Sequence, residues 1–367
     1  MKHYAGLDVS LEQTSVCVVD ESGSIVSEGK AGSDPEALTA WLGRAGCPIT
    51  RVGLEAGPLS VWLHRGLSAQ GYASVLMETR EVKARLNSGR HKTDRADARG
   101  IAQILRVGWF RPVHAKSEAA QDDRLVLTQR KFVQGQLRAL ENSVRGTLKG
   151  FGLKLGKVSV KGFAGRVREL VAGRELVVEV SEAMLAAREA MLASFKRLDT
   201  LMRARARDPL CHRLMTCPGV GPQTALAFRA TIDDPHRFKK SKQVGVHLGL
   251  TPRKYQSGET DRNGGISKQG DTLLRATLFE AAQALLTRVR RPSALQAWGR
   301  RLVRKRGRKR ATVAVARRLA VILHRMWVDG SEFRWTPPAD AAPAKAAATT
   351  AAPAKTALSR RALHAAV

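Results

Sequence analysis

Cysteine is scarce in this sequence, and the cysteines that are present lack a metal-binding spacing. The four are Cys17, Cys47, Cys211 and Cys217, and none belongs to a CxxC pair or lies near a histidine pattern. This spacing argues against the usual zinc sites and against a disulfide framework. We therefore expect buried thiols in a reducing compartment.

Long apolar runs and a signal-peptide pattern are also missing. No stretch approaches the length that spans a bilayer, and the residues after Met1 lack the regions of a secretory leader. We expect a cytoplasmic, nucleoid-associated protein without a membrane segment.

Acidic residues are about half as common as basic ones. The 367 residues include 63 Lys and Arg but only 32 Asp and Glu, which gives a formal charge of +31 and a pI near 11.1. Such an excess is self-repulsive and favours a polyanionic partner, most simply nucleic acid, with a membrane surface as the competing polyanion. The length allows two or three domains.

The first part of the chain has the pattern of an α/β domain. Three β-type runs are followed by helix, strand, helix and strand, at 3–10, 14–20, 24–30, 35–45, 49–54, 60–69 and 72–77. This is the order of a ribonuclease-H-like domain, although other α/β folds share parts of it.

Four acidic residues fall at the ends of these elements. Asp8 and Glu55 end the first and fourth strands, and Asp94 and Asp97 begin a helical segment. Each alone could be a cap or a surface charge. In a ribonuclease-H-like sheet, however, the first and fourth strands are neighbours and the last helix crosses them. Four carboxylates that lie close together repel one another and need cations to stay ionised. Two Mg²⁺ ions about 3.5–4 Å apart could activate a nucleophile and stabilise the leaving oxygen of a phosphodiester.

Two later stretches have apolar residues at helical spacing. They cover 121–149 and 184–202 and are separated by a glycine-rich passage at 150–165. They predict an antiparallel coiled-coil arm, which could serve oligomerisation.

Two glycine-containing motifs follow. The run TCPGVGPQTA at 216–225 matches the hairpin of a helix–hairpin–helix element, in which backbone N–H groups face a phosphate. An ordinary helix–helix turn is the alternative. Ser267 lies in a glycine-flanked loop just before a helix, beside Lys268. It could cap that helix or act as a nucleophile on a phosphodiester.

Basic residues near these motifs predict contacts with nucleic-acid phosphates. The densest run is 300–310, for which a solvated charged face is the alternative. The tail from residue 336 is rich in Ala and Pro, which predicts disorder. The predicted contact residues are Arg90, Lys92, Arg95, Gly219, Gly221, Arg253, Lys254, Arg262, Lys268, Arg304, Lys305, Arg306, Arg308, Lys309 and Arg310.

Seven of these segments together carry a resemblance to a known family. The chain resembles the transposases of the IS110 group of insertion sequences, also called DEDD transposases or bridge-RNA-guided recombinases. In chain order, the matching segments are GLDVS, LEAGP, HKTDRADARGIAQ, RVGWFRPVH, PGVGPQTA, HLGLTP and GGISKQGD. They extend over nearly all of residues 1–335, which is far more specific than any single motif.

The resemblance implies a fold and a division into domains. It implies a RuvC-like catalytic domain at 1–115, a helical arm at 116–207, and a mostly helical transposase domain at 208–335, before the tail at 336–367. It identifies Asp8, Glu55, Asp94 and Asp97 with the family's metal-binding tetrad and Ser267 with its DNA-attacking serine.

The activity implied is site-specific recombination of DNA. The family uses an RNA encoded in the element as guide, and its active site joins the tetrad of one subunit to the serine of another within a tetramer. From the residues alone, two other functions stay open. One is a Mg²⁺-dependent nuclease of the Holliday-junction-resolving kind, in which water replaces the serine. The other is a non-catalytic nucleic-acid chaperone, which would leave the ordered acids unexplained.

Overall fold

The computed structural model describes residues 1–86 and 93–335, and the chain divides into two compact units. The first comprises residues 1–122 and the second begins at residue 123. Among the described residues, no helix combines the length and apolar character needed to cross a membrane. Three of the four cysteines are buried, as expected, whereas Cys47 is half-buried. Burial raises the pKa of the Cys211 thiol to about 12.

The first unit is built on a mixed five-stranded sheet. Its order is β3-β2-β1-β4-β5, with β1 antiparallel to β2 and parallel to β4. The seven predicted strands and helices are confirmed within two residues at each end, and α3 is an element that the sequence pattern did not predict. The elements are β1 (His3–Val9), β2 (Gln13–Val19), β3 (Ile25–Gly32), α1 (Pro35–Gly43), β4 (Ile49–Glu55), α2 (Ser60–Ala69), β5 (Ser74–Met77), α3 (Thr79–Leu86) and α4 (Asp94–Val107). This sheet order is consistent with a ribonuclease-H-like domain.

Alternation along the strands divides the side chains between two faces of the sheet. On β1, Ala5 and Leu7 join the core that α1 and α2 cover. Gly6 and Asp8 are therefore on the opposite face, which α4 covers with Ala98 and Ala102. The helix lies against β1, β2 and β4.

A glycine on β1 sets how closely α4 approaches the sheet. A Cβ built on Gly6 would overlap the backbone of Ala98 and of Ala102. The small helix residues and the missing side chain therefore let the two backbones touch. Because Gly6 is only two residues before Asp8, this contact fixes α4 close to the end of the strand.

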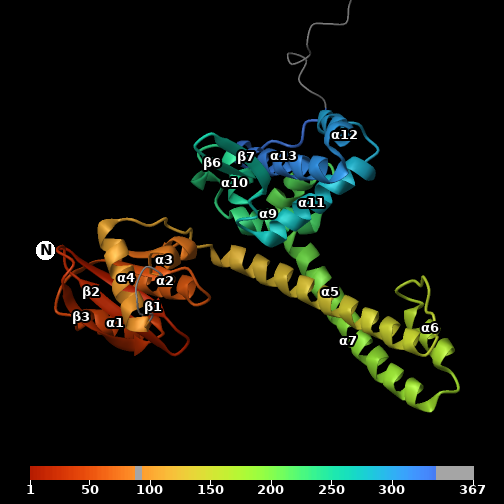
Figure 1. Cartoon of the computed structure of the whole chain (residues 1–367), viewed down its shortest axis with the longest axis horizontal. Coiled ribbons are helices and arrows are strands. Elements are labelled where there is room, and N and C mark those ends of the chain that lie inside the picture. Colours follow the sequence, from red (N-terminus) through yellow and green to blue (C-terminus); the bar gives the residue numbers. More distant parts are fainter. Residues whose placement is uncertain (87–92, 336–367) are drawn as a thin grey trace, which may run out of the picture. The chain divides into compact units, whose positions relative to one another are not determined.

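Two long helices that run in opposite directions make up the first part of the second unit, although the first turn of α5 still belongs to the first unit. α5 (Glu118–Gly150) and α7 (Glu175–Arg205) lie side by side in Figure 1. Ion pairs join successive levels of the two, Asp123 with Arg205, Arg130 with Asp199 and Glu141 with Arg188. Positions increase along α5 while they decrease along α7, so the pairing is antiparallel, as predicted.

The far end of this pair is closed by a helix that the sequence pattern did not predict. α6 (Phe163–Val171) lies within and just beyond the passage predicted as a glycine-rich connection. Its residues Phe163, Val167 and Val171 pack with Val144 and Leu148 of α5. The buried Arg188 guanidinium lies over the Phe163 ring, donates to the Val160 carbonyl and pairs with Glu141.

The rest of the second unit is mostly helical around one core. Buried side chains of α8, α9, α10, α11 and α13 form this core, with Leu127 of α5 and Met202 of α7 added to it. Its elements are α8 (Pro209–Met215), α9 (Pro222–Ile232), the short helix η1 (Pro235–Arg237), α10 (Lys242–His247), β6 (Pro252–Ser257), β7 (Thr260–Ile266), α11 (Thr272–Thr287), α12 (Ala294–Arg306) and α13 (Arg308–Asp329).

Gly6→Ala is expected to destabilise the first unit by about 1–3 kcal/mol, because the added methyl group must push α4 off the sheet. Urea unfolding of the full chain measures the loss. Gly43→Ala is the matched control, since nothing lies within 4 Å of a Cβ at that helix position, and its stability should stay within about 1 kcal/mol of the parent. Equal stability of the two variants would contradict the close contact between β1 and α4.

Candidate active-site residues and nucleic-acid surfaces

Asp8 and Glu55 lie at the same edge and on the same face of the sheet. The parallel register places Gly6 opposite Gly53 and Leu7 opposite Leu54. The acids therefore follow two residues after a matched pair of glycines, one on each neighbouring strand. By alternation, both carboxylates extend on the face that α4 covers.

The first turn of α4 lies at that same edge. Arg99 of α4 pairs with Glu28, while Gln103, one turn later, donates to the Gly23 carbonyl. In the sheet, Glu28 lies beside the middle of the strands, and Gly23 lies in the turn at the end of β2. α4 therefore runs antiparallel to β1, and its first turn, with Asp94 and Asp97, points toward the end of the strand that carries Asp8. Thr93 caps the helix by accepting from the Ala96 N–H group.

The four acids share an edge but are not drawn together into a closed metal site. Across residues 1–86 and 93–335, no three His, Cys, Asp or Glu side chains are close enough to hold an ion. Lys83 Nζ lies 3.9 Å from Glu55 Oε1, so an ammonium group already neighbours one of the carboxylates. The donor chemistry fits Mg²⁺, which prefers carboxylate oxygens, whereas the spacing of the donors is wider than a bound ion requires.

Arg95, predicted to contact a phosphate, lies next to an acid of the sheet. Its guanidinium pairs with Glu28, which also receives two hydrogen bonds of 2.8 Å from Arg99. Burial raises the pKa of the nearby Cys17 thiol, and Arg99 and Arg95 offset part of that rise. Arg95 thus helps to anchor α4 in this structure. Arg90 and Lys92 lie outside the described residues.

Ser267 lies in a loop that packs directly on another loop, and its own main chain is fixed. The Ser267 N–H group donates to the Thr251 carbonyl at 2.9 Å, and the Lys268 N–H group donates to Gly249 at 3.1 Å. A Cβ on Gly249 would overlap Gln269, and one on Gly270 would overlap the His247 carbonyl. The motifs HLGLTP and GGISKQGD are therefore the two halves of one structure, which we call the serine loop (residues 247–251 and 267–271).

The residue beside the serine has a strained backbone. Lys268 has a φ of 57°, in the left-handed region that favours glycine. Only one other described non-glycine residue, Asp233, has a positive φ. Strain of this kind persists only where the surrounding structure holds the backbone in place, and here main-chain bonds from Ser267 and Lys268 to the other half of the loop do so.

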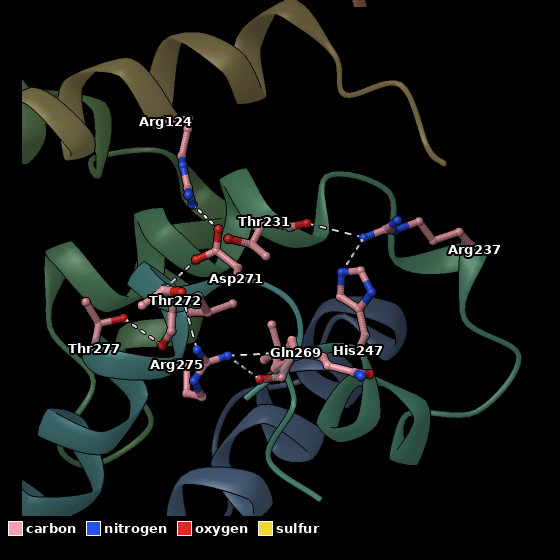
Figure 2. A network of polar contacts seen from close by, with 11 residues as sticks. Arg124, Thr231, Arg237, His247, Gln269, Asp271, Thr272, Arg275 and Thr277 are labelled. Atoms are coloured by element: carbon pink, nitrogen blue, oxygen red, sulfur yellow. Dashed lines mark hydrogen bonds and ion pairs between the residues drawn. The ribbon is translucent and has the colours of Figure 1, made fainter. Parts of the chain in front are cut away.

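A chain of polar contacts surrounds the serine loop (Figure 2). Arg275 donates to the carbonyls of Leu248 at 3.1 Å and Gln269 at 3.2 Å, one from each half of the loop. Asp271 caps α11 by accepting from the Leu274 N–H group, and its other oxygen pairs with Arg124 of α5. No sequence motif marks Arg124, which is 147 positions away from its partner.

A buried carboxylate near the N-terminus of α5 also holds this helix in place. Asp123 is 1 % exposed and accepts from Arg205 of α7 and from Arg229 of α9. Arg229 pairs further with Asp208, the cap of α8. Breaking such a buried pair leaves an uncompensated charge, so this network fixes the arm to the helical body.

The predicted helix–hairpin–helix glycines have different surroundings. Gly219 has a φ of 86°, and a Cβ there would overlap the Ala281 carbonyl of α11, so it is needed for packing. Gly221 has open space around it and precedes α9, whose start has no side-chain cap. A cavity of about 300 Å³ adjoins this start. Its charged lining residues are Arg130, Asp199, Arg203, Glu280 and Arg288.

The acids of this cavity lower its positive charge. Burial opposes ionisation of Asp199, but hydrogen bonds from Arg203 and Arg130 outweigh it and hold the pKa of Asp199 below its usual value. Two of the three arginines are thus already engaged. The predicted contact of Gly219 and Gly221 with a phosphate therefore stays a prediction.

The predicted C-terminal basic residues gather where α12 ends and α13 begins. Gly307, with a φ of 76°, forms the corner between the two helices. The buried positions of both helices, such as Gly299 and Val315, point into the core, and the basic side chains at the corner are exposed. These are Arg304, Lys305, Arg306, Arg308, Lys309 and Arg310.

Arg275→Ala should loosen the serine loop, because it removes the donors that join its two halves. Each hydrogen bond from a charged group contributes about 1.5–3 kcal/mol, so amide exchange at Ser267 and Lys268 should accelerate about tenfold or more. Hydrogen exchange with mass spectrometry measures it. Arg300→Ala, on the exposed face of α12, is the control and should leave the loop unchanged. Unaltered protection in Arg275→Ala would mean that main-chain bonds alone hold the loop.

Comparison with known proteins matches both units of the chain. A DEDD transposase model of the IS110 type matches residues 5–152, and the model for the transposase IS116/IS110/IS902 family matches residues 211–298. The chain is 28% identical to a transposase for insertion sequence element IS1111A of Coxiella burnetii, over 87% of each chain.

Other relatives match over different lengths. A probable family 20 transposase of Pseudomonas aeruginosa is 29% identical over 75% of this chain and 83% of its own. A pilin gene-inverting protein of Moraxella bovis is 31% identical over 31% of this chain and 36% of its own. Because these two family models match residues 5–152 and 211–298 and the Coxiella relative matches most of the chain, the chain belongs to the IS110/IS116/IS902 family of transposases.

Proposed function

We propose that this transposase cuts and rejoins DNA with Ser267 as the nucleophile. The observation that carries the proposal is the construction of the serine loop. Residues 247–251 and 267–271 pack backbone against backbone there, and Lys268 within this packing has a left-handed conformation. A serine that only capped α11 would need no such construction, and that cap is already supplied by Asp271.

The chemistry is a pair of transesterifications. The Ser267 Oγ attacks the phosphorus of a phosphodiester, the P–O3′ bond breaks, and the serine proton passes to the departing 3′ oxygen. A different 3′-hydroxyl then attacks the phosphoserine, forms a new P–O3′ bond and returns the proton to the serine. The bond energy is kept in the phosphoserine, so rejoining needs no external energy source. The neighbouring Lys268 ammonium can offset the charge that develops on the phosphate oxygens.

The acidic edge of the first unit supplies the cation site in this proposal. Asp8, Glu55, Asp94 and Asp97 would hold Mg²⁺, most simply two ions. When bound, these ions would neutralise phosphate charge and activate the attacking hydroxyl. The chain's own residues prepare the edge, since Glu28 with Arg99 holds α4 in place and Thr93 caps its first turn.

The proposal also includes the partners that the family resemblance implies. These are donor and target DNA, a guide RNA encoded in the element, and further copies of this chain in a dimer or tetramer. We also propose that the catalytic domain, the helical arm and the transposase domain end at residues 115, 207 and 335. The exposed basic corner between α12 and α13 and the residues Arg253 and Arg262 offer phosphate-binding charge, whereas the predicted contact residue Lys254 is paired with Asp261.

A hydrolytic nuclease is the second candidate, because the acidic edge belongs to a unit that is compact by itself. In that reaction water attacks, and no protein is joined to DNA. One comparison favours rejoining. The relative in Moraxella bovis is named for inverting a gene, and inversion of DNA requires that the cut strands be joined again.

Ser267→Ala should abolish covalent protein–DNA adducts while leaving the fold and DNA binding intact, since the side chain is half-exposed. A denaturing gel with end-labelled DNA detects the adduct. Ser331→Ala, which removes a serine hydroxyl bonded only locally to Asp329, is the control and should form adducts normally. Persistence of the adduct in Ser267→Ala would reject the nucleophile.

Asp97→Asn should reduce Mg²⁺-dependent strand cleavage to the background level, because one carboxylate of the acidic edge is lost while the shape of the side chain is kept. Cleavage of labelled DNA is measured against Mg²⁺ concentration, with circular dichroism to verify folding. Glu36→Gln, an exposed acid in the first turn of α1, provides the matched control. Normal cleavage by Asp97→Asn at all Mg²⁺ concentrations would remove Asp97 from the site.

A further inference from the structure

The ribbon formed by β6 and β7 has no covering layer. Every residue of the two strands is exposed except Ile266, which is partly buried. A two-stranded ribbon without a packed face is marginally stable by itself in water. Within the described part of the chain, therefore, both faces of this ribbon are available to a partner.

The two faces of the ribbon differ in charge. Tyr255 lies opposite Arg262 in the register, so these two side chains share one face. The register shifts beside Arg253, but a Cβ built on Gly264, two residues after Arg262, would lie 3.8 Å from the Arg253 Cβ, so Arg253 is on the same face. The tyrosine is 66% exposed. The strand positions on this face include no acid. We call it the tyrosine face.

The opposite face is electrically balanced. Lys254 Nζ lies 3.3 Å from Asp261 Oδ2, so the lysine has a carboxylate partner on the neighbouring strand. Gln256 lies opposite Asp261, and Asn263 lies opposite Lys254. A polyanion would gain little there, because it would have to compete with Asp261 for the only cation. Of the three ribbon residues predicted to contact phosphate, only Arg253 and Arg262 are on the unopposed face.

The base of the ribbon is the serine loop itself. Pro252 pairs with Ile266 at the end of the ladder, and the next contact along the chain is the bond from the Ser267 N–H group to the Thr251 carbonyl. A molecule that reaches the Ser267 hydroxyl therefore lies beside the ribbon. On the proposed function, that molecule is a DNA strand.

The residue types of the tyrosine face fit a nucleic-acid strand. Arginine side chains neutralise phosphates, and an exposed tyrosine ring can stack on a base or pack against a sugar. An acidic peptide would match the arginines but would leave the ring without a base to stack on. A membrane surface would require further apolar residues around the ring, and the ribbon has none exposed beside it.

We propose that the tyrosine face, Arg253, Tyr255 and Arg262, binds the DNA strand that Ser267 attacks. The arginines hold phosphates that flank the reacting one, and Tyr255 packs against a nucleotide next to it. The ribbon thereby sets the position of the scissile phosphate over the serine. This inference rests on the proposed function and adds to it a surface that holds the substrate.

Site-directed crosslinking tests which face meets the strand. In the full-length protein, a photoreactive p-benzoylphenylalanine replaces either Tyr255 or Gln256, its neighbour on the opposite face. Each protein is irradiated with labelled double-stranded DNA, with single-stranded DNA and with RNA of the same sequence. We expect at least about tenfold more DNA crosslinking from position 255 than from position 256. Equal yields from the two faces, or crosslinks confined to RNA or to another copy of the chain, would overturn the proposal.

Binding measurements supply a second test with natural side chains. Tyr255→Ala and Arg262→Ala should each weaken DNA binding about tenfold by fluorescence anisotropy at moderate salt, the size expected from loss of one stacked base or one phosphate contact. Asn263→Ala, on the balanced face, is the control and should bind within about twofold of the parent. A loss in Asn263→Ala as large as the other two would contradict the assignment of faces.

The crosslink and the covalent adduct separate this inference from the proposed function. Ser267→Ala in the photoreactive protein should keep the crosslink from position 255 and lose the phosphoserine adduct. If the crosslink forms and the parent protein never yields an adduct, DNA binding by the tyrosine face is supported and the nucleophilic role of Ser267 is rejected. If the parent yields adducts and position 255 crosslinks no better than position 256, the nucleophilic role of Ser267 is supported and DNA binding by the tyrosine face is rejected.

Discussion

Close contact between one backbone and another, at positions where only glycine leaves room, shapes both proposed catalytic regions. In the first unit, Gly6 lets α4 rest on the main chain of β1, which places the acidic first turn of the helix near the end of the strand. In the second unit, Gly249 and Gly270 let the two halves of the serine loop touch. A side chain at any of these positions would overlap the facing backbone and push the two pieces apart.

Arginine has two roles that composition alone does not separate. The charge excess of +31 suggests a surface devoted to phosphates, yet several arginines hold the fold together. Arg205 and Arg229 bind the buried Asp123, Arg188 binds Glu141, and Arg99 binds Glu28. Within the described part of the chain, the arginines at the α12–α13 corner and on the tyrosine face make no ion pair, and for these a polyanionic partner offers the clearest gain.

Local patterns predicted most of the secondary structure, because alternation and helical spacing are properties of neighbouring residues. The strands of the first unit and the two arm helices follow directly from such patterns. α6 was missed although Phe163, Val167 and Val171 have helical spacing, because the glycines before them indicated a connection. α3 was missed because only one of its residues, Val82, is buried.

Long-range contacts set the limit of prediction at the candidate sites. The sequence predicted Asp8, Glu55, Asp94 and Asp97 on elements that meet at one sheet edge, but no motif marks the Lys83 ammonium group that neighbours Glu55. Likewise, it singled out Ser267 and the glycines around it, whereas the packing on residues 247–251 and the bond between Arg124 and Asp271 join distant segments. Spacing along a chain carries no information about such partners.

The left-handed backbone of Lys268 lowers stability, while its side chain supplies a positive charge beside Ser267. An ordinary side chain in the left-handed region costs about 1 kcal/mol or more relative to glycine, so a glycine here would relieve the backbone. It would also remove the only ammonium group adjacent in sequence to Ser267. A glycine at this position would therefore relax the backbone and at the same time remove the positive charge beside Ser267.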